Sequence, residues 1–324
     1  MRSTLVMILI AVFALFSGSL LAENGEISGK VYYDYSWDLS ENADNANAFE
    51  MHRVYFTYKK KLADNLKFNM TTDVGREGNT GKFDAYLKYA YVDYKTNYGN
   101  VIIGLQSMNV FKIQEYNWGY RFIEKSAMDL NKWSSSADLG LGYKNKLAEK
   151  VTLWAVVSNG AGYKKIESDK YKKYSVNLNY GESKIAGKDG YNAGVVVAYE
   201  PYEFATDTTE NQTLFGVYGG YSKSAFRVGA EFDMFKDSGL DQTMQIISAY
   251  GTYKLTDKTE LLARVDLVDP NTDVDKDGHT YIIGGVNIKP AKGLYVAPNI
   301  RYVTYQADGM DNDVVLKLNF QIKF

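Results

Sequence analysis

The sequence predicts an all-β fold, namely a transmembrane antiparallel β-barrel of about sixteen strands that follows a cleaved signal peptide. Three observations predict it. Apolar and polar residues alternate with a period of two along many segments, as in strands with one apolar face. The connections between these segments alternate between short and long. The chain opens with a short apolar run behind a positive residue, which is the layout of an export signal.

Composition excludes several other classes. The chain has 324 residues, with 37 Lys+Arg against 39 Asp+Glu, no Cys and two His. Disulfide scaffolds and thiol chemistry are therefore excluded, little remains for His-based catalysis, and the near-neutral charge gives no reason to expect nucleic acid as a partner. No interior apolar run reaches the roughly 18 residues of a membrane helix. The 28 Tyr and 4 Pro suit membrane interfaces and long uninterrupted strands.

The first 22 residues are predicted to be the signal peptide. Arg2 is followed by the apolar run Leu5 to Phe16, then by the small residues Ser17 to Ser19, and Ala22 precedes the polar Glu23. As a helix this run spans about 18 Å, which is too short for a bilayer core of about 30 Å. An uncleaved anchor is the alternative. Residues 23–324 then form the barrel.

The strands are expected in sixteen segments along the mature chain. Fourteen is the alternative, because the phase of the alternation is ambiguous around 200–222 and 243–255. The expected segments are 26–37, 49–60, 65–75, 82–95, 100–107, 134–146, 150–159, 172–181, 190–199, 212–222, 225–236, 243–255, 259–269, 279–289, 293–305 and 312–324.

The alternation also predicts which face each residue takes. In a membrane barrel the apolar face meets lipid and the polar face lines the lumen. By this parity His52 is expected on the lipid face. Charged residues that face each other in the lumen, such as Arg264 and Asp233, could then neutralise each other.

The long connections are expected on the outer side and the short ones on the periplasmic side. Met108–Trp133 and Pro201–Asn211 are examples of long ones, and Thr96–Gly99 is a short one. Sixteen strands enclose a lumen too wide for side chains to fill, which favours an aqueous channel.

The C-terminal segment carries a resemblance. Phe320, Ile322 and Phe324 continue an apolar face that ends on the last residue. In this the chain resembles bacterial outer-membrane β-barrels, in which a terminal aromatic residue is the signal for assembly. The resemblance implies location in the outer membrane, with lipids, lipopolysaccharide and the barrel-assembly machinery as partners. An ordinary edge strand is the alternative.

The longest connection, residues 108–133, carries a second resemblance. It combines aromatic residues with Arg121, Glu124 and Lys125 and precedes a strand-like segment from 134. In this the chain resembles sixteen-stranded porins, and among them the phosphate-selective porins and their relatives, whose third loop folds into the barrel. The resemblance implies a pore constriction formed by Trp118, Arg121, Glu124 and Lys125, and a homotrimer. An outer cap or a trimer contact is the alternative for this loop.

Charged residues of both signs are expected along the lumen. The candidates are Arg53, Arg227, Arg264, Arg301, Glu231 and Asp266. Because rings of charge set ion preference and these signs are mixed, the sequence favours anions only slightly.

One outer connection suggests a cation site. Asp273, Asp275 and Asp277, followed by Gly278, place three carboxylates at a spacing that can wrap Ca²⁺. The twelfth position is Gly284 instead of Glu, so this is not a complete EF-hand loop. A weak Ca²⁺ site and a solvated acidic tip are the two interpretations, and no other cofactor is expected.

The predicted function is an outer-membrane porin for passive diffusion of small hydrophilic solutes and ions. An adhesin or structural surface barrel and a gated, solute-specific transporter are the alternatives. No enzyme is expected, because neither His52 nor His279 has an evident Ser partner.

Overall fold

The computed structural model describes residues 25–41, 43, 47–76 and 81–324. The predicted signal peptide, 1–22, lies outside these residues. The described chain forms sixteen strands and two short helices, which confirms the all-β prediction. In order they are β1 (Gly25–Asp38), β2 (Asn47–Ala63), β3 (Leu66–Arg76), β4 (Phe83–Thr96), β5 (Gly99–Ser107), α2 (Lys112–Trp118), α3 (Ala127–Leu130), β6 (Ala137–Ala148), β7 (Val151–Ser158), β8 (Lys173–Gly181), β9 (Gly190–Ala205), β10 (Thr208–Lys223), β11 (Phe226–Asp237), β12 (Gln242–Thr256), β13 (Thr259–Asp269), β14 (His279–Ala291), β15 (Leu294–Tyr305) and β16 (Asp313–Lys323).

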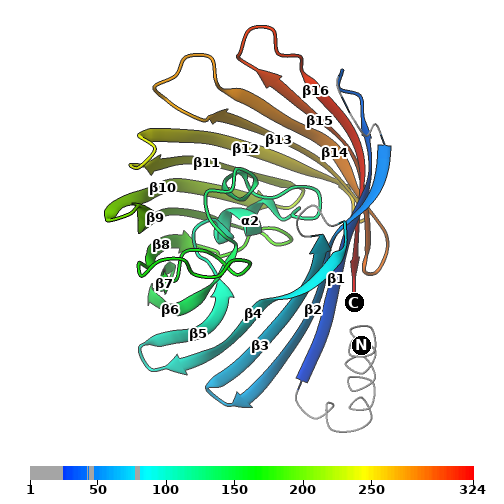
Figure 1. The fold of residues 1–324 in the computed structure, drawn as a ribbon. Coiled ribbons are helices and arrows are strands. Elements are labelled where there is room, and N and C mark those ends of the chain that lie inside the picture. The colour runs from blue at the N-terminus through cyan, green and yellow to red at the C-terminus, as the bar shows by residue number, and fades with distance from the viewer. Residues whose placement is uncertain (1–24, 42, 44–46, 77–80) are drawn as a thin grey trace, which may run out of the picture.

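The strands close into one antiparallel barrel (Figure 1). Each strand pairs with its neighbours in sequence, and β1 pairs with β16 from Lys30↔Lys323 to Asp38↔Val315. Closure pairs every strand on both sides, so the sheet has no edge strand. Sixteen strands is therefore correct, and the alternative of fourteen is wrong.

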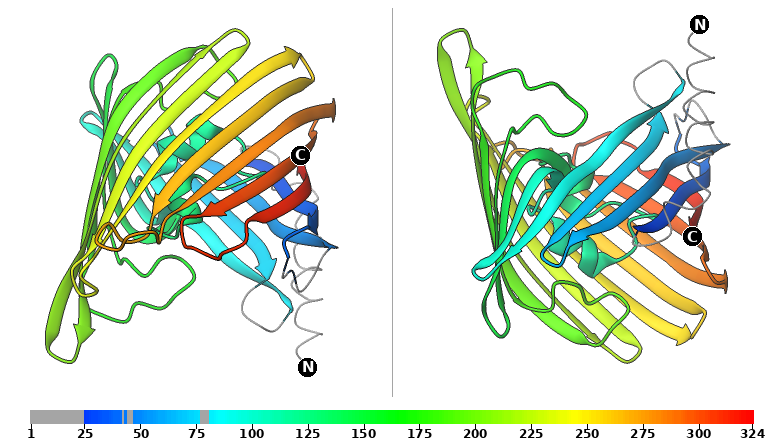
Figure 2. Two further views of the ribbon diagram at one scale, coloured as in Figure 1. Left: turned by 90° about the horizontal axis from the view of Figure 1, so that it is seen from above. Right: turned by 90° about the horizontal axis from the view of Figure 1, so that it is seen from below.

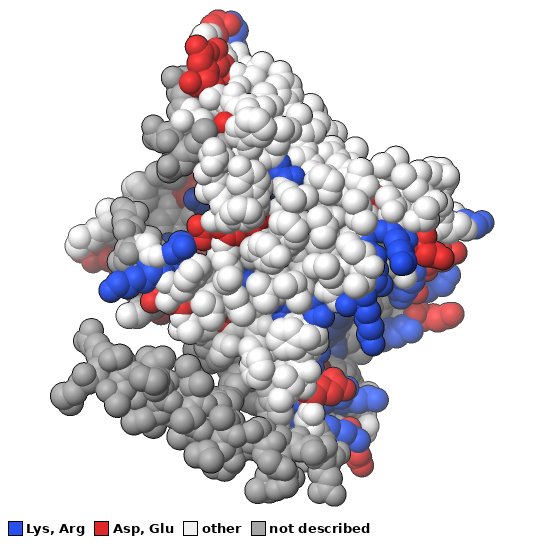
Figure 3. Space-filling view, turned by 90° about the vertical axis from the view of Figure 1, so that its right-hand side faces the viewer, with Lys and Arg blue, Asp and Glu red and all other residues white. Residues whose placement is uncertain are grey.

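The outer and inner faces follow the predicted alternation. Along β8, the exposed residues Tyr174, Val176 and Leu178 alternate with the buried Ser175 and Asn177. The exposed residues point outward, toward lipid, and the buried polar ones point into the lumen. Figure 3 shows the consequence on one side of the molecule, where uncharged residues form a broad band and charged residues gather towards its edges.

His52 does not obey the parity prediction. Tyr32 pairs with Arg53 but Tyr33 pairs with Met51, so His52 is the extra residue of a β-bulge. A bulge shifts the alternation by one residue. His52 therefore points into the lumen, where its Nε2 lies 2.8 Å from a carboxylate oxygen of Asp34.

One connection differs from expectation. The predicted long loop 201–211 does not exist, because β9 and β10 continue past it as a paired hairpin, and only residues 206 and 207 connect them. The turn 182–189, between β8 and β9, is longer than its neighbours and places the fully buried Ile185 close to Gly220 of β10. In the part of the chain that the structure describes, no helix has the length and apolar character needed to cross a membrane.

Candidate channel constriction

The third outer connection, 108–136, folds into the barrel. It carries α2 and α3, which lie inside the curve of the strands (Figures 1 and 2). We call residues 108–136 the inner loop. Local hydrogen bonds shape the inner loop: the Glu115 amide donates to the Phe111 carbonyl at 2.9 Å at the start of α2. The helix ends at Gly119, whose φ of 75° lets the chain reverse direction.

An apolar cluster anchors one side of the inner loop. Val110, Phe111, Ala127, Met128 and Trp133 pack against lumen-facing apolar residues of the wall. The wall residues are Val196, Ala198, Leu214, Phe235, Ile246 and Val268. Burial of this much apolar surface holds the loop against β9–β13 and removes that part of the lumen from water.

An aromatic cluster supports the middle of the inner loop. Trp118 lies edge-on to Tyr120 and Tyr250, with ring centroids 5.4 and 5.5 Å apart, and its indole donates to the Glu124 carbonyl at 2.9 Å. With 2% of its surface exposed, Trp118 does not line the open cavity described below. Its predicted place in the constriction is therefore wrong; its size and apolar ring make it a packing residue.

Wall arginines hold the backbone of the inner loop. Arg227 donates to the carbonyls of Asn117 and Trp118, both at 2.8 Å, Arg264 donates to that of Lys125, and Arg301 to that of Ile123. Arg227 and Arg264 are 5% and 3% exposed. The structure places these two predicted lumen residues behind the loop, where they bind backbone oxygen instead of facing the water.

The predicted pairing of Arg264 with Asp233 is wrong. Arg264 pairs instead with Asp266, two residues away on the same face of β13, with Nε 2.8 Å from Oδ1. Asp266 also accepts from Ser248 at 2.6 Å. On β11, the buried Asp233 and the half-buried Glu231 keep carboxylate oxygens without a hydrogen-bond partner among the described residues.

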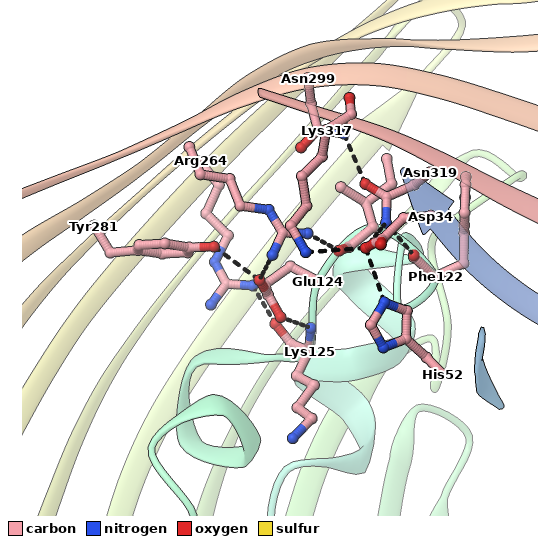
Figure 4. Close-up of polar contacts among 12 residues, drawn as sticks. Asp34, His52, Phe122, Glu124, Lys125, Arg264, Tyr281, Asn299, Lys317 and Asn319 are labelled. Atoms are coloured by element: carbon pink, nitrogen blue, oxygen red, sulfur yellow. Dashed lines mark hydrogen bonds and ion pairs between the residues drawn. The ribbon is translucent and has the colours of Figure 1, made fainter. Parts of the chain in front are cut away.

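Glu124 joins the tip of the inner loop to the far wall (Figure 4). One carboxylate oxygen lies 2.7 Å from Arg301 and accepts from Tyr281 at 2.7 Å; the other accepts from the Lys125 amide at 3.0 Å. Burial alone would raise the pKa of the Glu124 carboxyl, but Arg301 and these hydrogen bonds hold it below its usual value.

A second ion cluster lies within the inner loop. Glu115 is 2.6 Å from the Lys112 ammonium and 3.0 Å from Arg121, which also pairs with Asp129. Burial would raise the pKa of Glu115, but the two cations outweigh it and lower the pKa to about 2. Arg121 is thus bound on two sides by carboxylates of its own loop.

An open cavity of about 450 Å³ remains between the tip of the inner loop and the wall formed by β1–β4, β15 and β16. We call it the eyelet cavity. Its charged lining is mainly basic. The cations are Arg53, Arg76, Arg121, Lys125, Lys164, Arg301 and Lys317, and the carboxylates are Asp34, Glu50 and Glu124.

At least five of the seven cations have a carboxylate within ion-pairing distance. The pairs are Arg53–Asp73 at 2.7 Å, Arg76–Glu50 at 2.8 Å, Arg121–Glu115 at 3.0 Å, Arg301–Glu124 at 2.7 Å and Lys317–Asp34 at 2.9 Å. Asp34 also accepts from Asn319 at 3.4 Å, besides its contact with His52.

The cavity contains residues that sequence reasoning missed. Asp34, His52, Arg76 and Lys164 line it and were not among the expected lumen residues. The i, i+2 spacing of Lys317 and Asn319 on the polar face of β16 was an available signal. The bulge at His52 and the reach of Lys164 from an outer loop have no local sequence signal.

The outer loop 270–278 does not gather its carboxylates. No group of three or more His, Asp or Glu placed to hold a metal ion occurs within the described ranges. Lys276, between Asp275 and Asp277, instead pairs with Asp308 of the next outer loop at 2.5 Å. The Ca²⁺ site at Asp273, Asp275 and Asp277 stays a prediction.

The fold and the inner loop together define an outer-membrane β-barrel channel. Residues 9–287 match the family model of the Gram-negative porins. The chain belongs to this family, and its location is the bacterial outer membrane. No curated protein sequence matches it.

Solved structures show the same fold at low sequence identity. OprB of Pseudomonas putida is similar with a TM-score of 0.73 and 11% identity, over 96% of this chain and 97% of that one. OmpT of Vibrio cholerae gives 0.66 and 16%, over 93% and 97%. An anion-selective porin from Comamonas acidovorans gives 0.67 and 12%, over 93% and 99%.

Proposed function

We propose that the protein is a passive diffusion channel for small hydrophilic solutes and ions, constricted by its inner loop and mildly selective for anions. The observation that carries the proposal is the eyelet cavity, which is bounded on one side by Arg121–Lys125 of the loop and on the other by the barrel wall. Solutes then cross by diffusion through a charged aqueous passage without covalent chemistry.

The charge of the eyelet cavity supports the preference for anions. Seven cationic residues line it against three carboxylates. A narrow passage with an excess of one sign concentrates ions of the opposite sign. The anion selectivity named for the similar porin from Comamonas acidovorans agrees with this preference.

Deleting residues 112–128 tests the constriction. The variant removes α2 and the loop tip but none of the strands. Single-channel conductance in a planar bilayer should rise, because the widest obstacle in the lumen is gone. Heat-modifiable migration in gels establishes that the barrel has closed; a closed barrel with unchanged conductance would contradict the proposal.

The reversal potential in a salt gradient tests the ion preference. A reversal potential whose sign shows that anions permeate more readily than cations supports the proposal. The opposite sign rejects it. Barrels that carry no current at all would instead favour the adhesin, or a gated transporter whose opening needs its solute.

The assembly is part of the same proposal. A homotrimer, contacts with lipopolysaccharide and insertion by the barrel-assembly machinery fit a member of this family, and one similar structure, OmpT of Vibrio cholerae, is described in a trimer form. Sedimentation of the detergent-solubilised protein measures the oligomeric state directly.

A further inference from the structure

The charge of the eyelet cavity is less basic than its composition suggests. At least five of its seven cations are held by carboxylates at 2.7–3.0 Å, as described above. A close ion pair has little field beyond its own dimensions, because the two charges cancel at a distance. These five residues therefore shape the cavity more than they charge it.

Lys125 differs from these five. Among the residues that the structure describes, no carboxylate lies within 4.0 Å of its ammonium group, although the residue lines the cavity and is only half-buried. Lys164, the seventh cation, lies over the Tyr86 ring at 4.5 Å and has further interactions. Lys125 thus carries the charge that its surroundings compensate least.

The backbone of Lys125 is held by hydrogen bonds on both its carbonyl and its amide. Its carbonyl accepts from Arg264, and its amide donates to Glu124 at 3.0 Å. Glu124 is in turn held by Arg301 and Tyr281. Figure 4 shows the Lys125 side chain pointing away from this network. The inner loop therefore presents one ammonium group to the cavity from a backbone that hydrogen bonds hold in place.

We propose that Lys125 is the residue that sets anion selectivity, acting as a single-cation binding site for the anionic group of a permeating solute. Arg264, Arg301, Tyr281 and Glu124 are positioning residues for it. This inference rests on the proposed function, and it deepens it by naming the ligand class. A single ammonium suits monoanions such as chloride and small monocarboxylates, and it offers no second cation to clamp a multivalent anion.

Substitution at Lys125 tests the proposal. Lys125→Gln should lower the anion-to-cation permeability ratio about three-fold in dilute salt, and Lys125→Glu should reverse the preference. The reason is that a unit charge changes the electrostatic energy of an ion passing within a few ångströms, even in water. Single-channel conductance in concentrated salt should change little, since the Debye length is then about 3 Å. Lys276→Gln is the matched control: it removes one cation from an exposed outer loop, where Lys276 pairs with Asp308 outside the cavity, and it should leave the ratio nearly unchanged.

Chemical modification of a cysteine at position 125 changes the charge there within a single protein sample, and the anion preference is measured before and after. The chain has no Cys, so Lys125→Cys introduces the single reactive thiol. A cationic thiol reagent should restore the anion preference, and an anionic reagent should reverse it. This tests the charge at position 125 without changing the folded barrel.

The outcomes separate this inference from the proposed function. If Lys125→Gln retains the ratio of the unmodified channel, or Lys276→Gln lowers it equally, the assignment to Lys125 is wrong while the channel stands. If acetate permeates no better than phosphate, the monoanion class is wrong. If the unmodified protein carries no current, the proposed function itself fails.

Discussion

Asn117 of the inner loop and Asn192 of β9 form a reciprocal amide pair. Each side-chain nitrogen donates to the other side-chain oxygen, at 2.7 and 2.8 Å. Asn192 also donates to the backbone carbonyl of Glu182, in the turn that follows β8, at 2.7 Å. Both residues are buried. The pair therefore ties the end of α2 to the barrel wall and to a periplasmic turn at once.

Asn192→Ala should loosen α2 without opening the barrel. The change leaves the buried Asn117 amide without its partner, which costs about 1–3 kcal/mol of loop docking. Hydrogen exchange of the amides of residues 112–118 should accelerate, and the strand amides should stay protected. Asn312→Ala, which removes only an exposed contact with Tyr302, is the control. Equal exchange in the two variants would show that the amide pair does not hold the loop.

Acid should release the inner loop through Glu115. Its pKa in the folded protein is about 2, below the usual value of 4.5. A carboxyl with a depressed pKa stabilises the fold above its usual pKa, and this stabilisation is lost as the pH falls through the folded value. About 3 kcal/mol of docking should disappear between pH 4.5 and pH 2.

The fluorescence of Trp118, three residues after Glu115, offers the measurement. Its emission should shift to longer wavelength over that pH range as water reaches the indole. Glu115→Gln lacks the titrating group and should show no such step. A step of the same size in the variant would assign the transition to other carboxylates.

Gly104 in β5 is expected to tolerate no side chain. Its φ is 122°, and a Cβ there would lie 2.4 Å from the backbone oxygen of Ala90. Gly104→Ala should therefore lower the free energy of unfolding by about 1–3 kcal/mol. Gly284→Ala, on β14, is the control, because its nearest neighbour is a side-chain carbon at 3.8 Å. Urea midpoints measured in detergent compare the two, and similar midpoints would contradict the expectation.

Phe324 is expected to matter more for assembly than for the final fold. Its backbone makes two hydrogen bonds with Gly29, at 2.9 and 3.2 Å, and its ring lies directly over that glycine. Removing Phe324 leaves the nine paired positions of β1 and β16 intact. The shortened chain should refold from urea into detergent micelles at a rate close to that of the full chain, but it should fail to reach the outer membrane in cells. Failure in both settings would assign Phe324 a structural role instead.

The sequence predicted the wall well because the wall is governed by local rules. Period two places Ser175 and Asn177 inside and Val176 outside, and each strand of this kind needs only its own residues to be recognised. His52 shows where this fails. A bulge depends on the register with the neighbouring strand, so parity within β2 could not reveal it.

The position of the inner loop in the chain could be predicted from the sequence, but its packing against the barrel wall could not. Its length and aromatic content marked it, whereas the docking of Phe111 and Met128 on Val196, Leu214 and Phe235 joins residues about 70 to 125 positions apart. One sequence signal for this docking was available. Val195, Val196 and Val197 interrupt the alternation of apolar and polar residues in β9, which indicates an apolar residue on the lumen face. The ion pairs of the eyelet cavity depend on this docking, so their pattern was out of reach.

Alkaline pH should weaken the anion preference through Lys125. Burial lowers the pKa of its amine below the usual value of 10.5, although Asp129 acts in the opposite direction. A lysine with a lowered pKa loses its charge earlier as the pH rises, so the anion-to-cation permeability ratio should begin to fall before an ordinary lysine would titrate. Reversal potentials recorded from pH 7 to pH 10 provide the measurement. Lys125→Arg keeps its charge over that range, because guanidinium does not deprotonate there. The variant should therefore hold its ratio constant, and a parallel fall in the variant would place the titrating group elsewhere in the eyelet cavity.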